Sequence, residues 1–341
     1  MAAPSNDMTP AGGYGRGVVL ILLAGLLWST MGLGVRLIGE ASAFQILFYR
    51  SLGLLPVLFL YIAIASGGRP LRTLARTPTI SILGGLGLVV AFGGSIISLK
   101  ETTVANAVFL LSISPFFAAI LGRLLLGEPV RWVTWVTMII AGGGVAIMVA
   151  EGVSLGRLVG NVAAIVCTIG FAFYVIALRA ERASNPMPVV LLGGIYATVA
   201  AATAATVAGQ SLLIAVEDAA IAMGLGAVSL SGGLILFTLG SRTVPAAEAT
   251  LMSLLEVVLA PLWTYLAIGE QVGPYTLVGG GILIAALVIN ALSGLRKTVA
   301  PEPRLLPAPA IAALAAPRQL PWRLPEPAYD ATSRPRRHPA T

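Results

Sequence analysis

Two glutamates, Glu248 and Glu256, stand within one long apolar stretch, 246–268, that contains no other charged residue. An ionisable side chain costs about 2.5–3.5 kcal/mol at the centre of a membrane-spanning helix, so such residues are functional candidates. Glu256 lies near the middle of the stretch. It could line a central cavity, where it would carry a proton or bind an amine, or it could be a protonated, hydrogen-bonded packing group.

Glu248 precedes Glu256 by eight residues. In a helix this spacing is about 12 Å along the axis and about 80° around it, so both carboxylates can face one pore. Glu248 would then lie near the inner mouth of the pore. It could equally be an ordinary charge at the membrane interface.

Arg50 and Trp28 are unusual residues for the interior of an apolar stretch. Arg50 lies about six residues into its stretch, so its long side chain could reach the interface. It could also pair with Glu40 or Glu101, or hold a substrate carboxylate. Trp usually prefers the membrane interface, yet Trp28 lies mid-stretch; it could stack on a flat solute beside Ser29, or pack against other helices.

Polar side chains inside other apolar stretches complete the set of candidate substrate-binding residues. Hydroxyl, amide and phenol groups can fix the orientation of a solute in a mostly apolar pocket. Together with Trp28, Glu248 and Glu256, the candidates are Ser29, Asn106, Ser112, Ser114, Tyr174, Ser229 and Ser231.

The sequence lacks the residues that most enzymatic and metal chemistry requires. Its single histidine, His338, lies near the C-terminus, and its single cysteine, Cys167, lies alone in an apolar stretch. These positions exclude a histidine-based metal site, Ser–His or Cys–His catalysis and a disulfide framework. No nucleotide-binding fingerprint is present, so we expect no cofactor, no metal, no enzyme activity and no direct use of ATP.

The composition indicates a membrane protein. Of the 341 residues, 57 % are hydrophobic and 10 % are charged, whereas soluble domains carry about 25 % charged residues. The net charge is +7, but Lys and Arg lie in short connections and towards the C-terminus rather than on one face or stripe. That distribution argues against nucleic-acid binding.

About 20 apolar residues in a helix cross a bilayer core. The sequence contains ten such stretches, so we predict an all-α membrane protein with ten transmembrane helices. They span residues 18–38, 44–65, 80–99, 104–126, 132–150, 158–178, 188–208, 219–240, 246–268 and 274–293.

Positive charge sets the predicted orientation. With the N-terminus in the cytoplasm, the inner connections and the terminal segments hold most of the Lys and Arg residues, and the outer connections hold only Arg36, Lys100 and Arg157. By the positive-inside rule both termini are cytoplasmic. The 19 Arg against two Lys are compatible with a GC-rich bacterial genome, so we expect a bacterial inner membrane. Residues 1–17 form a cytoplasmic segment, and the proline- and arginine-rich residues 296–341 form a disordered cytoplasmic tail.

The sequence also repeats itself. One glycine pattern recurs at an offset of 139 and one helix-end motif at an offset of 142: Gly85-Leu86-Gly87 with Gly93-Gly94 as Gly224-Leu225-Gly226 with Gly232-Gly233, and Leu126-Gly127-Glu128 as Ile268-Gly269-Glu270. We infer two five-helix repeats, 18–150 and 151–295. Because five is odd, the second repeat enters the membrane from the opposite side, and the repeats are inverted as in many secondary transporters.

The repeat pairs the candidate residues. At an offset of 142, Ser114 corresponds to Glu256 and Asn106 to Glu248. A two-fold axis in the membrane plane brings equivalent midplane positions of opposite halves together. We therefore expect Ser114 and Glu256 to approach one central cavity, with Asn106 near its outer mouth.

Several short motifs lie in or at the ends of the first, second, fourth and ninth apolar stretches, and those of the fourth and ninth match each other: Leu27-Trp28-Ser29, Phe48-Tyr49-Arg50, Ala105-Asn106-Ala107, Ser114-Pro115, Leu126-Gly127-Glu128, Ala247-Glu248-Ala249, Leu255-Glu256 and Gly269-Glu270. With ten spans, they resemble the EamA-type family of the drug/metabolite transporter superfamily over about 18–293. One departure is Val257, where the family often has proline, so the kink expected in the ninth span is in question.

Proteins that resemble this pattern move amino acids, metabolites, nucleotide-like compounds or drugs, many of them as exporters. The resemblance therefore implies a secondary transporter of small organic solutes that exports them by alternating access, with protons as a candidate coupling ion. The alternative is an importer of a vitamin, cofactor or nucleotide-like compound, and a channel or membrane scaffold is a third class. We expect a small-molecule substrate and the lipid bilayer as partners, and no nucleic acid; the sequence indicates neither substrate identity nor oligomeric state.

Overall fold

The computed structural model describes residues 11–154, 157–180, 186–244, 249, 252 and 255–295. These residues are mostly helical and contain no strand. Glu248, residues 1–10 and the predicted tail, 296–341, lie outside the described residues.

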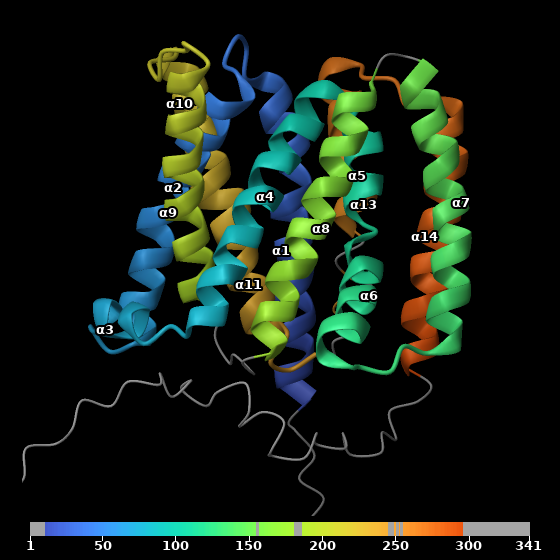
Figure 1. Ribbon diagram of the computed structural model, residues 1–341, viewed down its shortest axis with the longest axis horizontal. Helices are drawn as coiled ribbons and strands as arrows, with labels where there is room; N and C mark the ends of the chain where they lie inside the picture. Colours follow the sequence, from blue (N-terminus) through green and yellow to red (C-terminus); the bar gives the residue numbers. More distant parts are fainter. Residues whose placement is uncertain are drawn as a thin grey trace, which may run out of the picture. The chain divides into compact units, whose positions relative to one another are not determined.

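Residues 11–154 form seven helices (Figure 1): α1 (Ala11–Leu37), α2 (Ala43–Ala65), α3 (Pro70–Ala75), α4 (Thr79–Glu101), α5 (Val104–Leu111), α6 (Ser114–Leu126) and α7 (Trp132–Ser154). The described residues of the second half form α8 (Leu158–Ala180), α9 (Met187–Val207), α10 (Val216–Gly224), the π-helix η1 (Leu225–Gly232), α11 (Gly233–Gly240), α13 (Leu255–Ile268) and α14 (Pro274–Leu295). Apolar runs form helices here because a helix satisfies its backbone polar groups internally, which lipid cannot do.

Eight helices of the described residues are long and apolar enough to cross a membrane: Tyr14–Leu37, Ala43–Ala65, Ile82–Glu101, Val104–Leu126, Trp132–Glu151, Leu158–Leu178, Met187–Val207 and Val216–Gly240. They confirm the first eight predicted spans as apolar helices. The last two predicted spans, 246–268 and 274–293, coincide with the shorter apolar helices Leu255–Ile268 and Pro274–Asn290. The ninth is short here because most of its first residues lie outside the described part of the chain.

Two of the predicted spans are not regular α-helices. The fourth is interrupted between α5 and α6, where Ser112 N–H donates to the carbonyls of Val108 and Phe109 at 3.0 and 3.2 Å. Pro115, in the first turn of α6, has no N–H to continue the helical pattern. The eighth span contains the π-helical segment η1, and π-helical turns within α-helices occur frequently at functional sites.

The ends of α6 and α13 have the same backbone geometry. Gly127 and Gly269 follow these helices with φ of 68° and 67°, a left-handed conformation that glycine adopts without steric cost. Glu128 N donates to Gly122 O at 3.1 Å, and Glu270 N donates to Thr264 O at 3.3 Å. In both places the residue after the glycine donates to a carbonyl six residues earlier, so the two copies of the sequence motif adopt equivalent local structures.

Helices of one half take most of their packing partners from the other half, an arrangement that we call the exchange of partners (Figure 1). In one direction, α4 packs on α8 and α9, and α5 and α6 pack on α8; in the other, the eighth span packs on α1 and α2, and α13 packs on α1. The remaining large contacts, of α2 with α9 and of α7 with α14, join equivalent helices. Each half therefore packs mainly against the other half.

Glycines allow two of these contacts to be very close. A Cβ atom on Gly144 of α7 would lie 2.5 Å from Gly279 O of α14, and one on Gly279 would lie 2.5 Å from Gly144 O. Gly87 of α4 and Gly170 of α8 form a similar reciprocal pair at 2.7 Å. Because small residues let backbones approach, helix packing in lipid depends on such sites.

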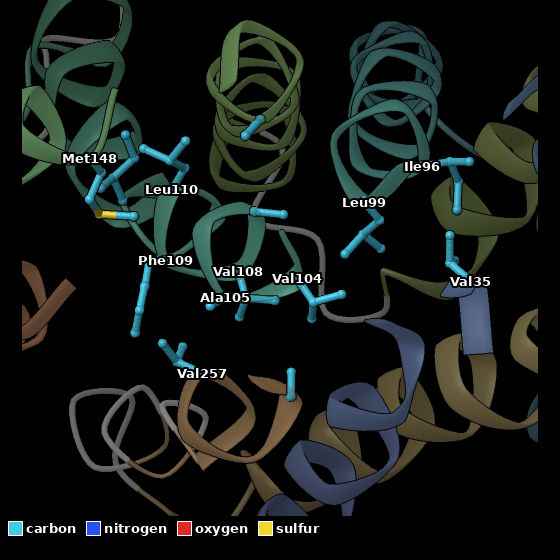
Figure 2. Close-up of a cluster of buried hydrophobic side chains, with 14 of the residues drawn as sticks. Val35, Ile96, Leu99, Val104, Ala105, Val108, Phe109, Leu110, Met148 and Val257 are labelled. Atoms are coloured by element: carbon cyan, nitrogen blue, oxygen red, sulfur yellow. The ribbon is translucent and has the colours of Figure 1, made fainter. Parts of the chain in front are cut away.

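A buried apolar cluster joins α5 to α13. Val257 on α13 is 5 % exposed and belongs to a cluster with Ala105, Val108 and Phe109 of α5. Figure 2 shows Val257 directed towards the α5 side chains. Val257 thus fills space where the family often has proline, and the proline of this helix is Pro261.

Candidate functional site

The middle of α1 carries the densest group of sequence-predicted site residues. Ser29 is fully buried and accepts a hydrogen bond from Trp263 Nε1 of α13 at 2.9 Å. Its own hydroxyl donates to Leu26 O at 2.7 Å. Trp263 was not predicted, although its spacing of seven residues from Glu256 places both on one side of a helix.

Trp28 lies on the adjacent side of α1. Its ring is 5.5 Å from that of Phe237 of α11 and closely approaches Gly233. Trp28 Nε1 is buried and has no hydrogen-bond partner among the described residues. Since buried polar groups are normally hydrogen-bonded, this donor is an exception that calls for an explanation.

The π-helix η1 supplies two predicted serines. Ser229 is buried, and its hydroxyl lies 2.8 Å from Thr30 Oγ1 of α1. Ser231 is fully buried and donates to Gly226 O, five residues earlier, at 2.8 Å. Ser229 therefore links η1 to α1, whereas Ser231 supports the irregular backbone of η1.

Arg50 lies inside the protein and not at its surface. Its side chain is 2 % exposed, and Nη2 donates to Phe92 O of α4 at 3.2 Å. The guanidinium carbon lies 5.1 Å from the Phe92 ring centroid, and Nη1 lies 4.0 Å from Met31 Sδ. Neither Glu40 nor Glu101 forms an ion pair with it, because Arg50 points inward from α2.

Glu256 and Ser114 are half-buried residues in the first turns of α13 and α6. Their neighbours in sequence, Val257 and Ile113, belong to the same buried cluster. The backbone of Glu256 also lies close to α1, since a Cβ atom on Gly25 would lie 3.9 Å from Glu256 N. The start of α13 therefore adjoins α1, the helix that carries Trp28 and Ser29.

Two predicted residues have clear local roles. Ser112 donates to Phe109 O at 2.7 Å, in the break between α5 and α6. Tyr174 of α8 is 5 % exposed, packs 5.6 Å from the Phe171 ring and joins the apolar cluster of Leu88 and Phe92. Tyr174 thus fills the contact between α4 and α8, and the structure does not group it with Trp28.

Asn106 forms a buried amide pair. Its Nδ2 atom donates to Asn161 Oδ1 of α8 and, at 3.0 Å, to Thr102 Oγ1. Asn106 Oδ1 and Asn161 Nδ2 are buried without partners. Sequence analysis missed Asn161. Its position as a polar residue within an apolar stretch could have identified it.

A pocket of about 250 Å³ lies at one end of the helices, on the side predicted to face outward. It is lined by Arg36, Lys100, Glu101, Thr102, Thr103, Arg157 and Glu270. Arg36 Nε binds Glu270 Oε2 at 2.8 Å, and Glu270 Oε1 accepts from Val104 N at 2.6 Å. Arg36 Nη2 also donates to Thr102 O at 2.5 Å. This network ties the end of α1 and the end of α13 to the connection between α4 and α5.

A family model for EamA-like transporters matches the chain twice, over residues 15–150 and 158–292. The chain belongs to the EamA-like transporter family. It is therefore a multi-pass membrane protein of a transporter family, with two EamA repeats. Comparison with curated proteins gave no match. A solved structure titled "Crystal structure of protein" aligns with a TM-score of 0.58 and 17 % identity, over 83 % of this chain and 99 % of that chain; at this identity the likeness concerns the fold alone.

In this EamA protein, three predicted site residues and Arg50 gather at the middle of α1. Trp28 and Ser29 lie on α1 itself, Ser229 of η1 bonds Thr30, and Arg50 contacts Met31. Ser231 of η1 instead donates to Gly226 O and, at 3.5 Å, to Leu54 O of α2. Asn106 lies apart, one helical turn from Thr102 at the outer pocket. The central group was predictable as polar residues in apolar spans, whereas the contacts of Trp263 with Ser29 and of Arg36 with Glu270 appear only in the packing.

Proposed function

We propose that this EamA protein is a secondary transporter that exports small organic solutes across the bacterial inner membrane by alternating access. The observation that carries the proposal is the exchange of packing partners between the two repeats. When each half packs on the other in the same way, two conformations can interconvert by exchanging the roles of the halves.

The proposed architecture is ten spans in two inverted repeats, 18–150 and 151–295. Equivalent spans of a five-span repeat run in opposite directions, so the axis that relates them lies in the membrane plane. In support, the start of α1 and the end of α14 lie at the same edge of the helices (Figure 1), as an even number of spans requires. We assign this edge to the cytoplasm because α3 and the connection before α7, with Arg72 and Arg131, lie there too.

The proposed solute site comprises Trp28, Ser29, Ser229 and Glu256, with Ser114 and Ser112 at the break in the fourth span. Discontinuous helices at the repeat interface are typical of transporter sites, because their free backbone groups can bind a solute. Asn106 and Glu248 are proposed to flank this site towards the outer and inner mouths. Glu256 is the proposed proton carrier.

We assign the closure of the outer mouth to the Arg36–Glu270 pair. By the sequence repeat, Glu128 corresponds to Glu270 at the offset of 142. Alternating access then requires the outer pair and an inner contact at Glu128 to open in turn. A solute would never meet both mouths open.

Counterflow in proteoliposomes tests the proposal. Vesicles that hold the purified full chain are loaded with an unlabelled amino acid or metabolite, and uptake of the labelled compound is measured. A carrier gives transient, saturable accumulation above the equilibrium level for at least one member of the panel. Flux that rises without saturation would indicate a channel, and absence of flux for every compound would contradict the transporter assignment.

A further inference from the structure

Arg50 is a buried cation that lacks an anionic partner. Its guanidinium contacts one carbonyl, one aromatic ring and one thioether, all from Phe92 and Met31. Among the described residues, no carboxylate forms an ion pair with it. Its Nε–H group is buried and finds no acceptor in the described part of the chain.

Such an arrangement is unfavourable in an empty protein. Removing a guanidinium from water requires a compensating charge or a full set of hydrogen bonds. A neutral carbonyl and the face of a phenyl ring compensate only part of the charge. The unpaired Nε–H adds the cost of a buried donor without an acceptor.

A second unpaired donor, Trp28 Nε1, lies on α1 against Gly233 of α11. Met31, which touches Arg50, and Trp28, whose Nε1 is unpaired, are three residues apart on α1. This spacing is about 4.5 Å along the axis, and residues three apart are neighbours on a helix surface. Both unpaired groups can only donate hydrogen bonds. The missing partner must therefore bring acceptor atoms, and a negative charge for Arg50.

We propose that Arg50 binds the carboxylate group of the transported solute, with Trp28 beside it. This inference rests on the proposed transport function and defines its substrates as monocarboxylates, amino acids included. A planar guanidinium matches a carboxylate with two parallel N–H···O bonds. A single cation is neutralised by a monoanion, whereas a doubly charged phosphate would leave excess charge inside the membrane. Glu256 lies in the first turn of α13 with its backbone close to Gly25 of α1, three residues before Trp28, and its carboxylate is suited to an ammonium group of the same solute.

Binding of matched acid and amide probes tests this assignment without requiring transport. Affinities are measured on the purified full chain in detergent for leucine, phenylalanine and benzoate, each paired with the carboxamide that lacks its carboxylate. We expect at least one acid to bind at least about tenfold more tightly than its amide. Equal affinities within every pair, or no binding by any acid, would overturn the assignment. Tight binding of inorganic phosphate or of taurine, a sulfonate, without binding of any carboxylate would overturn it as well.

Variants separate recognition from packing. Arg50→Gln should abolish the preference for the acid, and Arg50→Lys should retain part of it, since a point charge remains without the planar fork. Arg131→Gln, which removes an arginine bound to Asn290 and Ser293 away from this site, should leave the preference unchanged. An acid preference that persists in folded Arg50→Gln protein would contradict the proposal. If that variant does not fold, the proposal is tested by the acid preference of Arg50→Lys and of the wild-type protein.

The two proposals fail in different ways. Acid-selective binding without counterflow would reject transport and keep the carboxylate site. Counterflow of solutes with no acid preference would keep transport and reject the role of Arg50.

Discussion

At the scale of single residues, the hydrogen bond from Trp263 to Ser29 joins α13 to α1 at the centre of the proposed site. We predict that Ser29→Ala lowers the free energy of unfolding by about 1 kcal/mol, because the buried indole N–H loses its acceptor. Thermal unfolding in detergent measures the effect. Ser241→Ala, at an exposed hydroxyl that bonds only Thr238 O, is the control and should leave the midpoint unchanged.

Glu256 is the residue whose charge we expect to couple transport to protons. If it takes up a proton from outside while the solute leaves, an inwardly directed proton gradient should accelerate export. Glu256→Gln cannot exchange a proton, so its transport rate should no longer respond to the gradient. Transport assays at equal and unequal pH on the two sides measure this, with the exposed Glu217→Gln as control; an unchanged response in Glu256→Gln would remove Glu256 from the coupling.

Sequence patterns identified some residues of the candidate site and not others, for a physical reason. Trp28, Ser29, Ser229 and Ser231 are detectable because polar or bulky groups at such depth are costly or unusual in any membrane helix. The inward direction of Arg50 was not predictable, because it depends on where the carbonyl and ring of Phe92 lie in three dimensions. The partners of Asn106 depend likewise on packing between distant segments.

At the scale of elements, the Arg36–Glu270 pair should hold the outer mouth closed. Arg36→Gln or Glu270→Gln removes the ion pair, so residues beneath the pocket should become accessible more often. Ser98→Cys, at a fully buried position on α4 one turn before Thr102, reports this opening in a Cys167→Ala background. We expect a membrane-impermeant maleimide to label it several-fold faster.

The exchanged pair Arg36→Glu with Glu270→Arg is the matched control for the outer mouth. It restores opposite charges across the same contact and should return labelling towards the wild-type rate. Labelling that is equally slow in all variants would show that the ion pair does not restrict access.

The contact between α7 and α14 provides a second prediction at this scale. Gly144→Ala places a Cβ atom 2.5 Å from Gly279 O, so the two helices must separate and the unfolding temperature should fall. Gly143→Ala, on the same helix with no atom within 4 Å of the new Cβ, is the control. It should be neutral or raise the stability by about 0.5–1 kcal/mol, as expected for alanine in a helix interior. Equal effects of the two changes would contradict the close packing.

Helix positions were predictable from apolar run length, because the bilayer sets that length. The break at Ser112 and the π-helix η1 were not predicted, since the apolar runs continue through both. Pro115 gave a local signal for the break. For η1 the apolar run gave no such signal, and the close packing of its Gly226 against Arg50 O of α2 is visible only in the structure.

At the scale of the whole molecule, the duplicated sequence anticipated the equivalent ends of α6 and α13, but not which helices touch. Contacts between halves depend on side-chain fit over many residues, as in the cluster of Val257 and Phe109. The motif Gly127-Glu128 and its copy Gly269-Glu270 identify equivalent positions in sequence, whereas Arg36 as the partner of Glu270 appears only once α1 and α13 lie side by side.

The exchange of partners between halves also bears on how the protein is made. When α4 leaves the ribosome, its main partner α8 has not yet been synthesised, and α1 must wait still longer for α13. The newly inserted amino-terminal half should therefore remain loosely associated in the membrane and be open to proteolysis. We predict that residues 1–156 and 157–341 are each degraded when expressed alone and accumulate together when co-expressed, as pulse-chase labelling would reveal. Membrane proteases would therefore distinguish completed chains from incomplete ones. A translation pause before α8 would lengthen the time during which the amino-terminal half is exposed to them.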